Sequence, residues 1–334
     1  MRSLLKTWSC ITVVLLLFGC TSQDAQMKPT VVVYTSVDQV YSSKIFELFE
    51  QESGIRIKAL YDTEASKAVG LKKRLLAEKE NPRADIFWNS EPLQTAILAQ
   101  NGVFASYPSA TLSNRYASDI YYDDNHSLWY GIGGRKRVII VNTERLKPSE
   151  YPRTLEALWS KRFEGEVALS YPFAGTAATH FSALYTKLGE KHFKALLQRI
   201  RNAKTTFLSG NSVVMEAVAS GQYLVGIVDT DDVKAGLREE KKVEEVHYDQ
   251  NGSGNFLLFG TVSLIKGAPN PETAKKFMEF LLRPETEKLL IEEGAIDTPL
   301  LSGGHSGCKS WSVEPETLAK SYRQTKRVLQ RLIR

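Results

Sequence analysis

The sequence predicts an α/β fold built from two lobes. The chain of 334 residues is longer than the roughly 250–300 residues at which a single hydrophobic core usually stops growing. Between residues 31 and 102, short apolar segments alternate with segments of helical periodicity, which predicts a parallel sheet flanked by helices. Farther along, the apolar residues 223–228 run directly into Asp229, Asp231 and Asp232. Carboxylates so close together are costly to bury, and we expect them to meet water, a helix N-terminus or a cation.

The N-terminus predicts a secretory signal peptide over residues 1–19. Arg2 and Lys6 precede a mostly apolar run at residues 8–18, which is about half of the ~20 residues needed to span a bilayer. The four residues that end in Cys20 resemble the bacterial lipobox, which implies cleavage before Cys20 and acylation of its thiol. An uncleaved membrane anchor is the alternative interpretation.

Processing at Cys20 would place the mature chain outside the cytoplasm, at the periplasmic face of a membrane or on the cell surface. The polar residues 20–29 would then form a tether. Cys10 leaves with the signal peptide and Cys308 remains alone, so no intrachain disulfide is expected. The 43 basic and 38 acidic residues give a net charge of +5, which is too small and too dispersed to predict nucleic-acid binding.

The first lobe is expected to begin with a strand at residues 31–34 and a helix. Tyr41, Ile45 and Phe49 recur every fourth residue on one face of this helix, which ends at Gly54. The lobe continues with strands at 55–60 and 85–88, a helix that ends near 79 and a helix at 92–101.

Acidic residues follow the strands of this lobe. Asp38, Glu64 and Glu91 each come just after a predicted strand. Ligands of open parallel sheets bind beyond the carboxyl ends of the strands, so we expect these acids along one rim. In the alternative interpretation, Glu91 stabilises a helix N-terminus through the helix dipole, and Asp62 and Glu64 cap the helix that follows them.

The second lobe is expected to span residues 131–259, and the first lobe residues 30–130 and 260–300. Predicted elements of the second lobe lie at 138–141, 167–170, 177–188, 191–201, 211–218 and 223–228. A strand at 255–265 is expected to cross back to the first lobe, where helices at 271–282 and 284–293 would pack. Residues 301–334 would form a C-terminal extension with a basic amphipathic helix that starts near 314.

Five stretches in this order resemble the extracellular solute-binding proteins of ABC importers, specifically the ferric-iron-binding group. They are VYTS at 33–36, ADIFWNSE at 84–91, RKRVIIVNT at 135–143, GNSV at 210–213 and KGAPNP at 266–271. The resemblance runs from about residue 31 to residue 300. It implies a two-lobed periplasmic-binding-protein fold with crossing hinge strands and a central ligand cleft. It also implies a binding protein that serves an ABC permease and ATPase, acts as a monomer and is not an enzyme.

The resemblance further implies where the ligand binds. Members of this group hold iron through a histidine after the first strand, a glutamate after the third strand and a tyrosine pair, with a bound anion completing the coordination. Glu91 matches the glutamate, whereas Asp38 replaces the histidine. Asp231 and Asp232 replace the tyrosine pair. Residues that match anion-binding positions, or that are expected in the same cleft, are Tyr34, Ser36, Arg135, Arg137, Gly175, Thr176, Asn211 and Asp229.

The chemistry of Asp38, Glu91, Asp231 and Asp232 suits a hard cation, because such ions prefer oxygen ligands. Iron(III) with a synergistic anion is the first hypothesis, and the ion would be cargo rather than a cofactor. An organic amine is a second cargo, paired to the carboxylates and packed on Tyr34, Trp88 or Trp129. A small anionic metabolite held by Arg135 and Asn211 is a third.

Other interpretations of the same residues stay open. If extended, residues 229–232 would point alternately to two sides, so at least one of their three acids is expected to cap a helix that starts near Val233. Arg135 and Arg137 would then form a solvated face or an ion pair between the lobes. A surface lipoprotein that presents its ligand to another protein is an alternative to transport. The sequence lacks the nucleophile, phosphate-loop and zinc-protease motifs that would indicate an enzyme.

Overall fold

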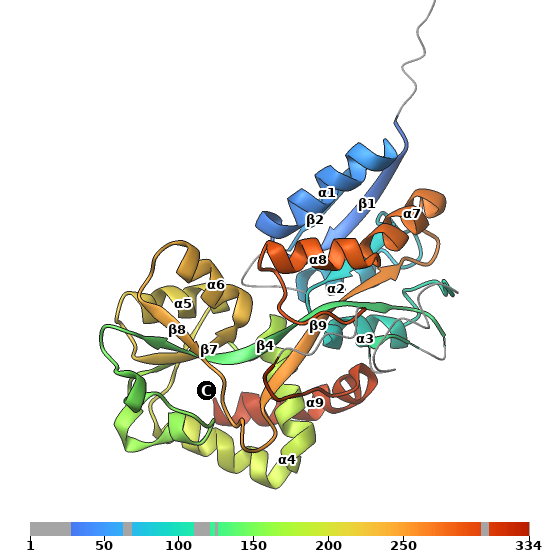
Figure 1. Ribbon diagram of the computed structural model, residues 1–334. Helices are drawn as coiled ribbons and strands as arrows, with labels where there is room; N and C mark the ends of the chain where they lie inside the picture. The colour runs from blue at the N-terminus through green and yellow to red at the C-terminus, as the bar shows by residue number, and fades with distance from the viewer. Residues whose placement is uncertain (1–27, 63–68, 110–120, 124–125, 302–306, 334) are drawn as a thin grey trace, which may run out of the picture.

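The computed structural model describes residues 28–333, except 63–68, 110–120, 124–125 and 302–306 (Figure 1). The predicted signal peptide at 1–19, the lipidation site Cys20, most of the tether at 20–29 and Glu64 lie outside the described residues. Within the described part of the chain, no helix combines the length and the apolar character that a bilayer crossing needs.

Lobe 1 contains the predicted parallel sheet. Strand β1 (Thr30–Thr35) pairs in parallel with β2 (Arg56–Tyr61) on one side and with β3 (Ile86–Asn89) on the other. The helices of this lobe are α1 (Gln39–Ser53), α2 (Val69–Ala77), α3 (Pro92–Gln100), α7 (Pro271–Leu281) and α8 (Pro284–Glu292). The predicted helix–strand alternation is therefore confirmed.

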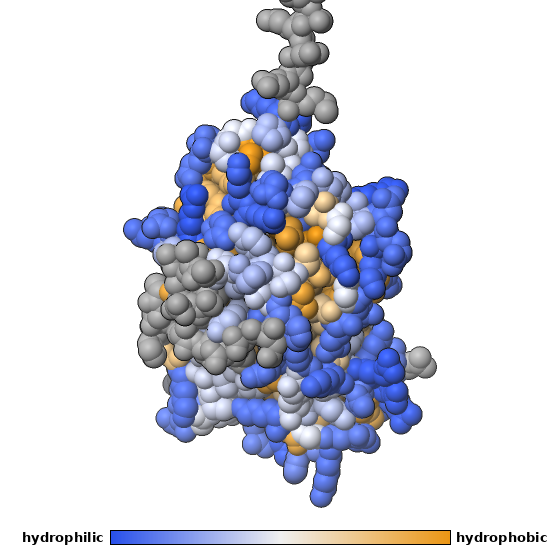
Figure 2. Space-filling model, turned by 90° about the vertical axis from the view of Figure 1, so that its right-hand side faces the viewer, coloured by the Kyte–Doolittle hydropathy of each residue, from blue (hydrophilic) through white to orange (hydrophobic). Residues whose placement is uncertain are grey.

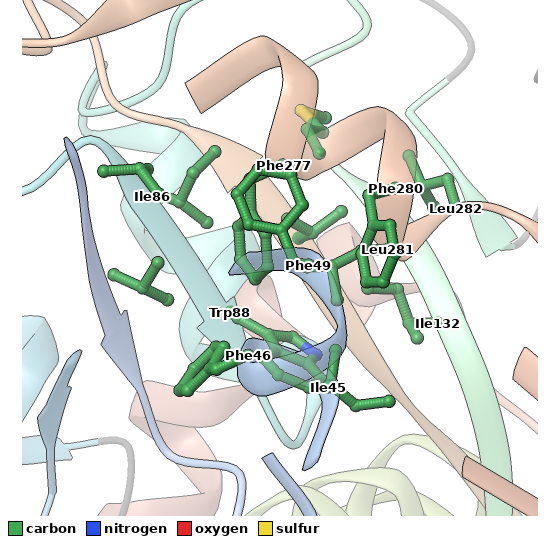
Figure 3. Close-up of a cluster of buried hydrophobic side chains, with 14 of the residues drawn as sticks. Ile45, Phe46, Phe49, Ile86, Trp88, Ile132, Phe277, Phe280, Leu281 and Leu282 are labelled. Carbon is green, nitrogen blue, oxygen red and sulfur yellow. The ribbon is translucent and has the colours of Figure 1, made fainter. Parts of the chain in front are cut away.

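Aromatic side chains hold the core of lobe 1 together (Figure 3). Phe46 and Phe49 from α1 contact Phe277 from α7, and Trp88 from β3 meets the rings of Phe46 and Phe277 edge-on. The apolar spacing along α1 thus buries one helix face against residues more than 200 positions away in the chain. Each aromatic pair contributes about 0.5–1.5 kcal/mol beyond its buried area.

Lobe 2 is a second α/β unit. Its strands are β5 (Val167–Ser170), β6 (Thr206–Leu208), β7 (Val225–Asp229) and β8 (Val243–Val246). Its helices are α4 (Gly175–Asn202), α5 (Asn211–Ala219) and α6 (Thr230–Arg238). The two helices predicted at 177–188 and 191–201 are confirmed: α4 is interrupted at Gly189, whose φ of 71° and ψ of 163° are not helical.

Two long strands connect the lobes. The first half of β4 (Tyr130–Asn142) pairs with β9 (Asn255–Leu264), and the second half pairs with β7 and β8 in lobe 2. The other end of β9 pairs antiparallel with β3 in lobe 1, which confirms the predicted return crossing. The whole sheet follows the order β2-β1-β3-β9-β4-β7-β5-β6.

The prediction of a strand limited to 138–141 is wrong. Residues 131–137 carry three glycines and three cations, which favour a loop by local rules, but they continue the strand. Pairing with β9 as far as Lys136, interrupted by a bulge between Ile132 and Gly134, and pairing with β7 at Arg137 extend the strand. Acidic partners offset the cationic charge: Lys136 Nζ lies 2.7 Å from Asp297 Oδ1.

The C-terminal segment packs across both lobes. After the short strand β10 (Ser310–Trp311), α9 (Pro315–Leu332) lies against α3 of lobe 1 and α4 of lobe 2. The predicted amphipathic helix is confirmed: Leu318 and Leu329 are buried, and its basic residues lie on the exposed face. One side of the whole molecule is largely hydrophilic, with smaller apolar areas between the polar residues (Figure 2).

Candidate functional site

A small polar pocket lies where four helices begin. It encloses about 30 Å³. Its wall includes the N-cap residues of α1, α4, α5 and α6, which are Asp38, Ala174, Gly210 and Asp229. Asp38 belongs to lobe 1 and the other three to lobe 2, so the pocket lies between the lobes. The partial positive charge of four helix N-termini favours an anionic group at this place.

Three carboxylates of lobe 2 gather on one side of this pocket. Asp229, Asp231 and Asp232 each offer an oxygen, and these oxygens lie within 4.8 Å of one another. Strand β7 ends at Asp229 and α6 begins at Thr230, so the acids are not extended and the expected alternation of sides does not apply. The predicted helix start near Val233 is therefore three residues too late, because Asp229 already caps the helix.

Asp229 is a structural acid. It forms a capping box with Asp232, whose Oδ2 accepts the backbone N–H of Asp229 at 3.0 Å, as expected for at least one acid of this stretch. Its carboxylate also binds two arginines, with 2.8 Å from Arg137 Nη1 to Oδ1 and 3.2 Å from Arg135 Nε to Oδ2. Burial by itself would raise the pKa of Asp229, but the charges of Arg137 and Arg135 hold it below its ordinary value.

Arg135 connects Asp229 to the pocket. Its Nε lies 3.4 Å from Asp231 Oδ1, and the side chain lines the pocket wall. Burial would lower the pKa of Arg135, but the surrounding carboxylates, with Asp231 first, raise it. The charges of all four aspartates in the pocket wall act on Arg135, the one arginine in that wall among the described residues, so negative charge is in excess there.

Arg137, a predicted ligand-binding residue, does not line the pocket but holds residues that do. Its Nη1 donates to Thr176 Oγ1 at 3.3 Å and to Asn211 Oδ1 at 3.0 Å, so it joins the first residues of α4 and α5 to Asp229. The predictions of a solvated face and of an ion pair between the lobes are wrong for these contacts: both arginines are buried, and their ion pairs with Asp229 lie within lobe 2.

The structure brings eight of the predicted residues to the pocket and leaves others outside it. Those in its wall are Asp38, Arg135, Gly175, Thr176, Asn211, Asp229, Asp231 and Asp232. Sequence reasoning missed Ser170, Tyr171, Ala174, Ala177, Ser209 and Gly210. Their positions in the sequence could have indicated three of them, because Ser170 ends a strand and Ser209 and Gly210 precede a helix. Tyr171 is 51 % exposed at this rim and offers a further oxygen donor.

Glu91 is not among the residues that line this pocket, which corrects its assignment to the metal cluster. Its side chain is 0 % exposed and caps α3, where it accepts the N–H groups of Leu93 at 2.6 Å and Gln94 at 3.0 Å. The Thr179 hydroxyl of α4 donates to its Oε2 at 2.5 Å. The helix N-terminus interpretation describes Glu91 correctly, because its own helix and lobe 2 already use its oxygens.

Burial raises the pKa of Glu91 above its ordinary value, although these hydrogen bonds oppose the shift. A raised folded-state pKa means that ionised Glu91 costs stability, so its contribution becomes less favourable as pH rises from the unfolded pKa of about 4.3 through the higher folded value. We expect Glu91→Gln to remove this part of the pH dependence. Urea unfolding of both proteins between pH 4 and pH 7 measures it, and parallel curves would contradict the assignment.

Of the aromatic residues predicted near the ligand, Tyr34 and Trp129 lie away from the pocket, whereas Trp88 lines a neighbouring small pocket with Asp38, Arg135 and Asp231. Trp88 and Trp129 are each 1 % exposed and belong to separate apolar clusters. The Tyr34 hydroxyl donates to Glu78 at 2.9 Å, beside the guanidinium of Arg74, and its ring packs in a third cluster. None of the three rings lines the polar pocket: strand alternation turns Tyr34 and Trp88 into the core, and Trp129 is buried just before β4. Ser36 is also buried, and its hydroxyl donates to Asn89 Oδ1 at 2.6 Å.

Comparison with known sequences places the chain in a family. The sequence pattern of the family described as "Bacterial extracellular solute-binding protein" matches residues 81–309. The "Fe(3+)-binding periplasmic protein" of Serratia marcescens is 23 % identical over 300 residues, which cover 88 % of this chain and 85 % of the relative. "Iron uptake protein A1" of Synechocystis is 25 % identical over 321 residues, with 90 % and 87 % covered.

Solved structures share the fold. Iron-bound HitA from Pseudomonas aeruginosa superposes with a TM-score of 0.79 at 18 % identity, covering 91 % of this chain and 99 % of its own. AfuA from Actinobacillus pleuropneumoniae, with exogenous fructose-6-phosphate bound, has a TM-score of 0.75 at 20 % identity, with 92 % and 98 % covered. The predicted two-lobed periplasmic-binding-protein fold is confirmed. Because the family pattern covers more than half of the sequence, the chain belongs to the bacterial extracellular solute-binding proteins.

Proposed function

We propose that this protein captures a hard metal cation, with iron(III) as the preferred cargo, and delivers it to an ABC permease and ATPase for import. The observation that carries the proposal is that Asp231 and Asp232, whose carboxylate oxygens lie within 4.8 Å of each other and of Asp229, share a pocket wall with Asp38. Hard cations prefer such oxygen ligands. Relatives named as iron-binding and iron-uptake proteins support the same cargo.

The residues divide into roles. Asp38, Asp231 and Asp232 supply the metal ligands, whereas Asp229 holds the two arginines and caps α6. Arg135 and the helix N-termini at Gly175, Thr176 and Asn211 favour a small oxyanion beside the metal. The site would bind a cation at the carboxylates and an anion at the helix N-termini, side by side. The two kinds of group can therefore occur in the same pocket.

The size and lining of the pocket favour an ion over an organic amine. A volume of about 30 Å³ is far below the roughly 300–1,000 Å³ of sites for drug-sized molecules. The rings of Trp88 and Trp129, which would have packed on an ammonium group, are buried in the cores.

A small anionic metabolite is the second candidate. Arg135 and the four helix N-termini favour it, and a structure of AfuA holds fructose-6-phosphate. Opening of the lobes would be needed to make room for such a molecule in this pocket.

Ligand-induced stabilisation tests the metal proposal. At 100 times its dissociation constant, the true ligand should add about 2.7 kcal/mol to the free energy of unfolding. We expect this shift with iron(III), and a larger one when phosphate or carbonate is added. Elemental analysis and native mass spectrometry of protein purified without chelators should show one bound metal ion. Stabilisation by a sugar phosphate alone, with none by iron(III), manganese(II) or calcium, would favour the second candidate.

In this proposal the mature chain starts at Cys20, carries a lipid there and acts as a monomer outside the cytoplasm. The lipobox-like residues before Cys20 and the periplasmic relative support that location. The proteins to which the chain is related are binding proteins and not enzymes, in agreement with the missing catalytic motifs. Presentation of the ligand to another surface protein is the alternative to transport.

A further inference from the structure

Helix α6 turns one face toward lobe 1. Asp231, Lys234 and Arg238 are spaced i, i+3 and i+7, so they lie along the same side of the helix. Asp231 lines the pocket at the start of the helix. Lys234 Nζ donates to the backbone oxygen of Ile296 in lobe 1 at 3.3 Å. The side that carries a proposed metal ligand therefore also carries contacts to the other lobe.

At the end of α6, Arg238 makes two hydrogen bonds and a ring contact to lobe 1. Its Nη1 donates to the backbone oxygen of Glu293 at 2.8 Å, and its Nη2 donates to the Tyr41 hydroxyl at 3.1 Å. The guanidinium also lies 5.7 Å from the centre of the Tyr41 ring. A cation near the face of an aromatic ring adds an attraction to the hydrogen bonds.

Lobe 1 is shaped to receive this arginine. Gly294, which follows α8, has a φ of +81°, and a Cβ there would lie 2.6 Å from Arg238 Nη1. Tyr41 stands in the first turn of α1, three residues after Asp38.

Two helices from opposite lobes thus start at the pocket and meet again at a second point. Helix α1 begins beside Asp38 and α6 beside Asp231, and the Tyr41–Arg238 contact joins the two helices farther along, where Tyr41 also lines a small pocket with Asp38 and Asp231. We propose that Arg238 is a positioning residue that latches the lobes together and so holds Asp231 and Asp232 opposite Asp38. The proposal rests on the proposed binding site but not on the identity of its ligand.

The contact of Arg238 with Tyr41 would raise the apparent affinity by increasing the fraction of molecules whose lobes are closed. Contacts that exist only when the lobes meet favour the closed form, and apparent affinity falls in proportion to the fraction that is closed. Arg238 is exposed, so its hydrogen bonds are worth little individually. We expect Arg238→Met to weaken binding about 3- to 10-fold, mostly through faster dissociation.

The test uses the full-length protein and four variants. Small-angle X-ray scattering without ligand compares the radius of gyration of Arg238→Met, Arg238→Lys, Tyr41→Phe and the control Arg201→Met, an exposed arginine in the last turn of α4. Stopped-flow fluorescence measures dissociation of iron(III) supplied as ferric citrate. We expect Arg238→Met to enlarge the ligand-free protein and to speed dissociation, Tyr41→Phe to do both more weakly, and Arg201→Met to do neither. Arg238→Lys should show smaller changes in both the radius of gyration and the dissociation rate than Arg238→Met.

The two readouts separate this proposal from the proposed function. If the unchanged protein does not bind iron(III), the metal proposal fails, while the scattering comparison still tests the latch. An unchanged radius of gyration in both Arg238→Met and Tyr41→Phe would overturn the latch. In a double-mutant cycle, additive effects of Tyr41→Phe and Arg238→Met would also overturn it, because the two side chains would then act independently.

Discussion

Asp231→Asn is expected to weaken iron(III) binding about 100-fold, which corresponds to ~2.7 kcal/mol. Asparagine keeps the shape of the side chain but removes one negative oxygen from the cluster that Asp229, Asp231 and Asp232 form. It also removes one of the two carboxylates that contact Arg135 Nε, at 3.4 Å. Isothermal titration with iron(III) as ferric citrate measures the change in the dissociation constant.

A matched control separates ligand loss from a general change in charge. Glu47 is exposed on α1, and Glu47→Gln should leave the affinity unchanged although it removes the same charge. The melting temperature of ligand-free Asp231→Asn should stay close to that of the unchanged protein, because Asp229 and Asp232 still cap α6. Equal affinities of Asp231→Asn and the unchanged protein would show that the cation does not bind at this cluster.

Arg137→Met is expected to destabilise the protein by about 3–5 kcal/mol, since it leaves the buried carboxylate of Asp229 with fewer partners. The lost contacts are the 2.8 Å ion pair with Asp229 Oδ1 and the hydrogen bonds to Thr176, Asn211 and the backbone oxygen of Ile227. Two helix starts and the end of β7 would lose their common link. Urea unfolding measures the change in the free energy of unfolding.

A control variant and a double variant test the cause of that destabilisation. Lys194→Met removes an exposed ion pair with Glu190 on α4 and should leave the free energy of unfolding nearly unchanged. Adding Asp229→Asn to Arg137→Met should recover part of the lost stability, because the uncompensated charge disappears. A loss below about 1 kcal/mol in Arg137→Met would mean that Arg135 alone satisfies Asp229.

Elements with a local apolar pattern were predictable. The spacing of Tyr41, Ile45 and Phe49 identified α1, and Leu318 and Leu329 marked the buried side of α9. Such patterns report which side of a helix is buried, whatever covers it. The predicted bounds were wrong where pairing with a distant strand decided them, as at residues 131–137, which become part of β4 by pairing with β9 and β7.

The residues of the candidate site were also only partly predictable. That acids follow the strands is visible in the sequence, because apolar runs end in Asp229 and just before Glu91. Which of these acids reach the pocket depends on how the two lobes pack. Glu91 does not line it, because the N–H groups of Leu93 and Gln94 and the hydroxyl of Thr179, 88 positions away, use its carboxylate. Asp38 and Asp231 do reach the pocket, because the crossing strands β4 and β9 hold the two lobes face to face, and no local pattern encodes that contact.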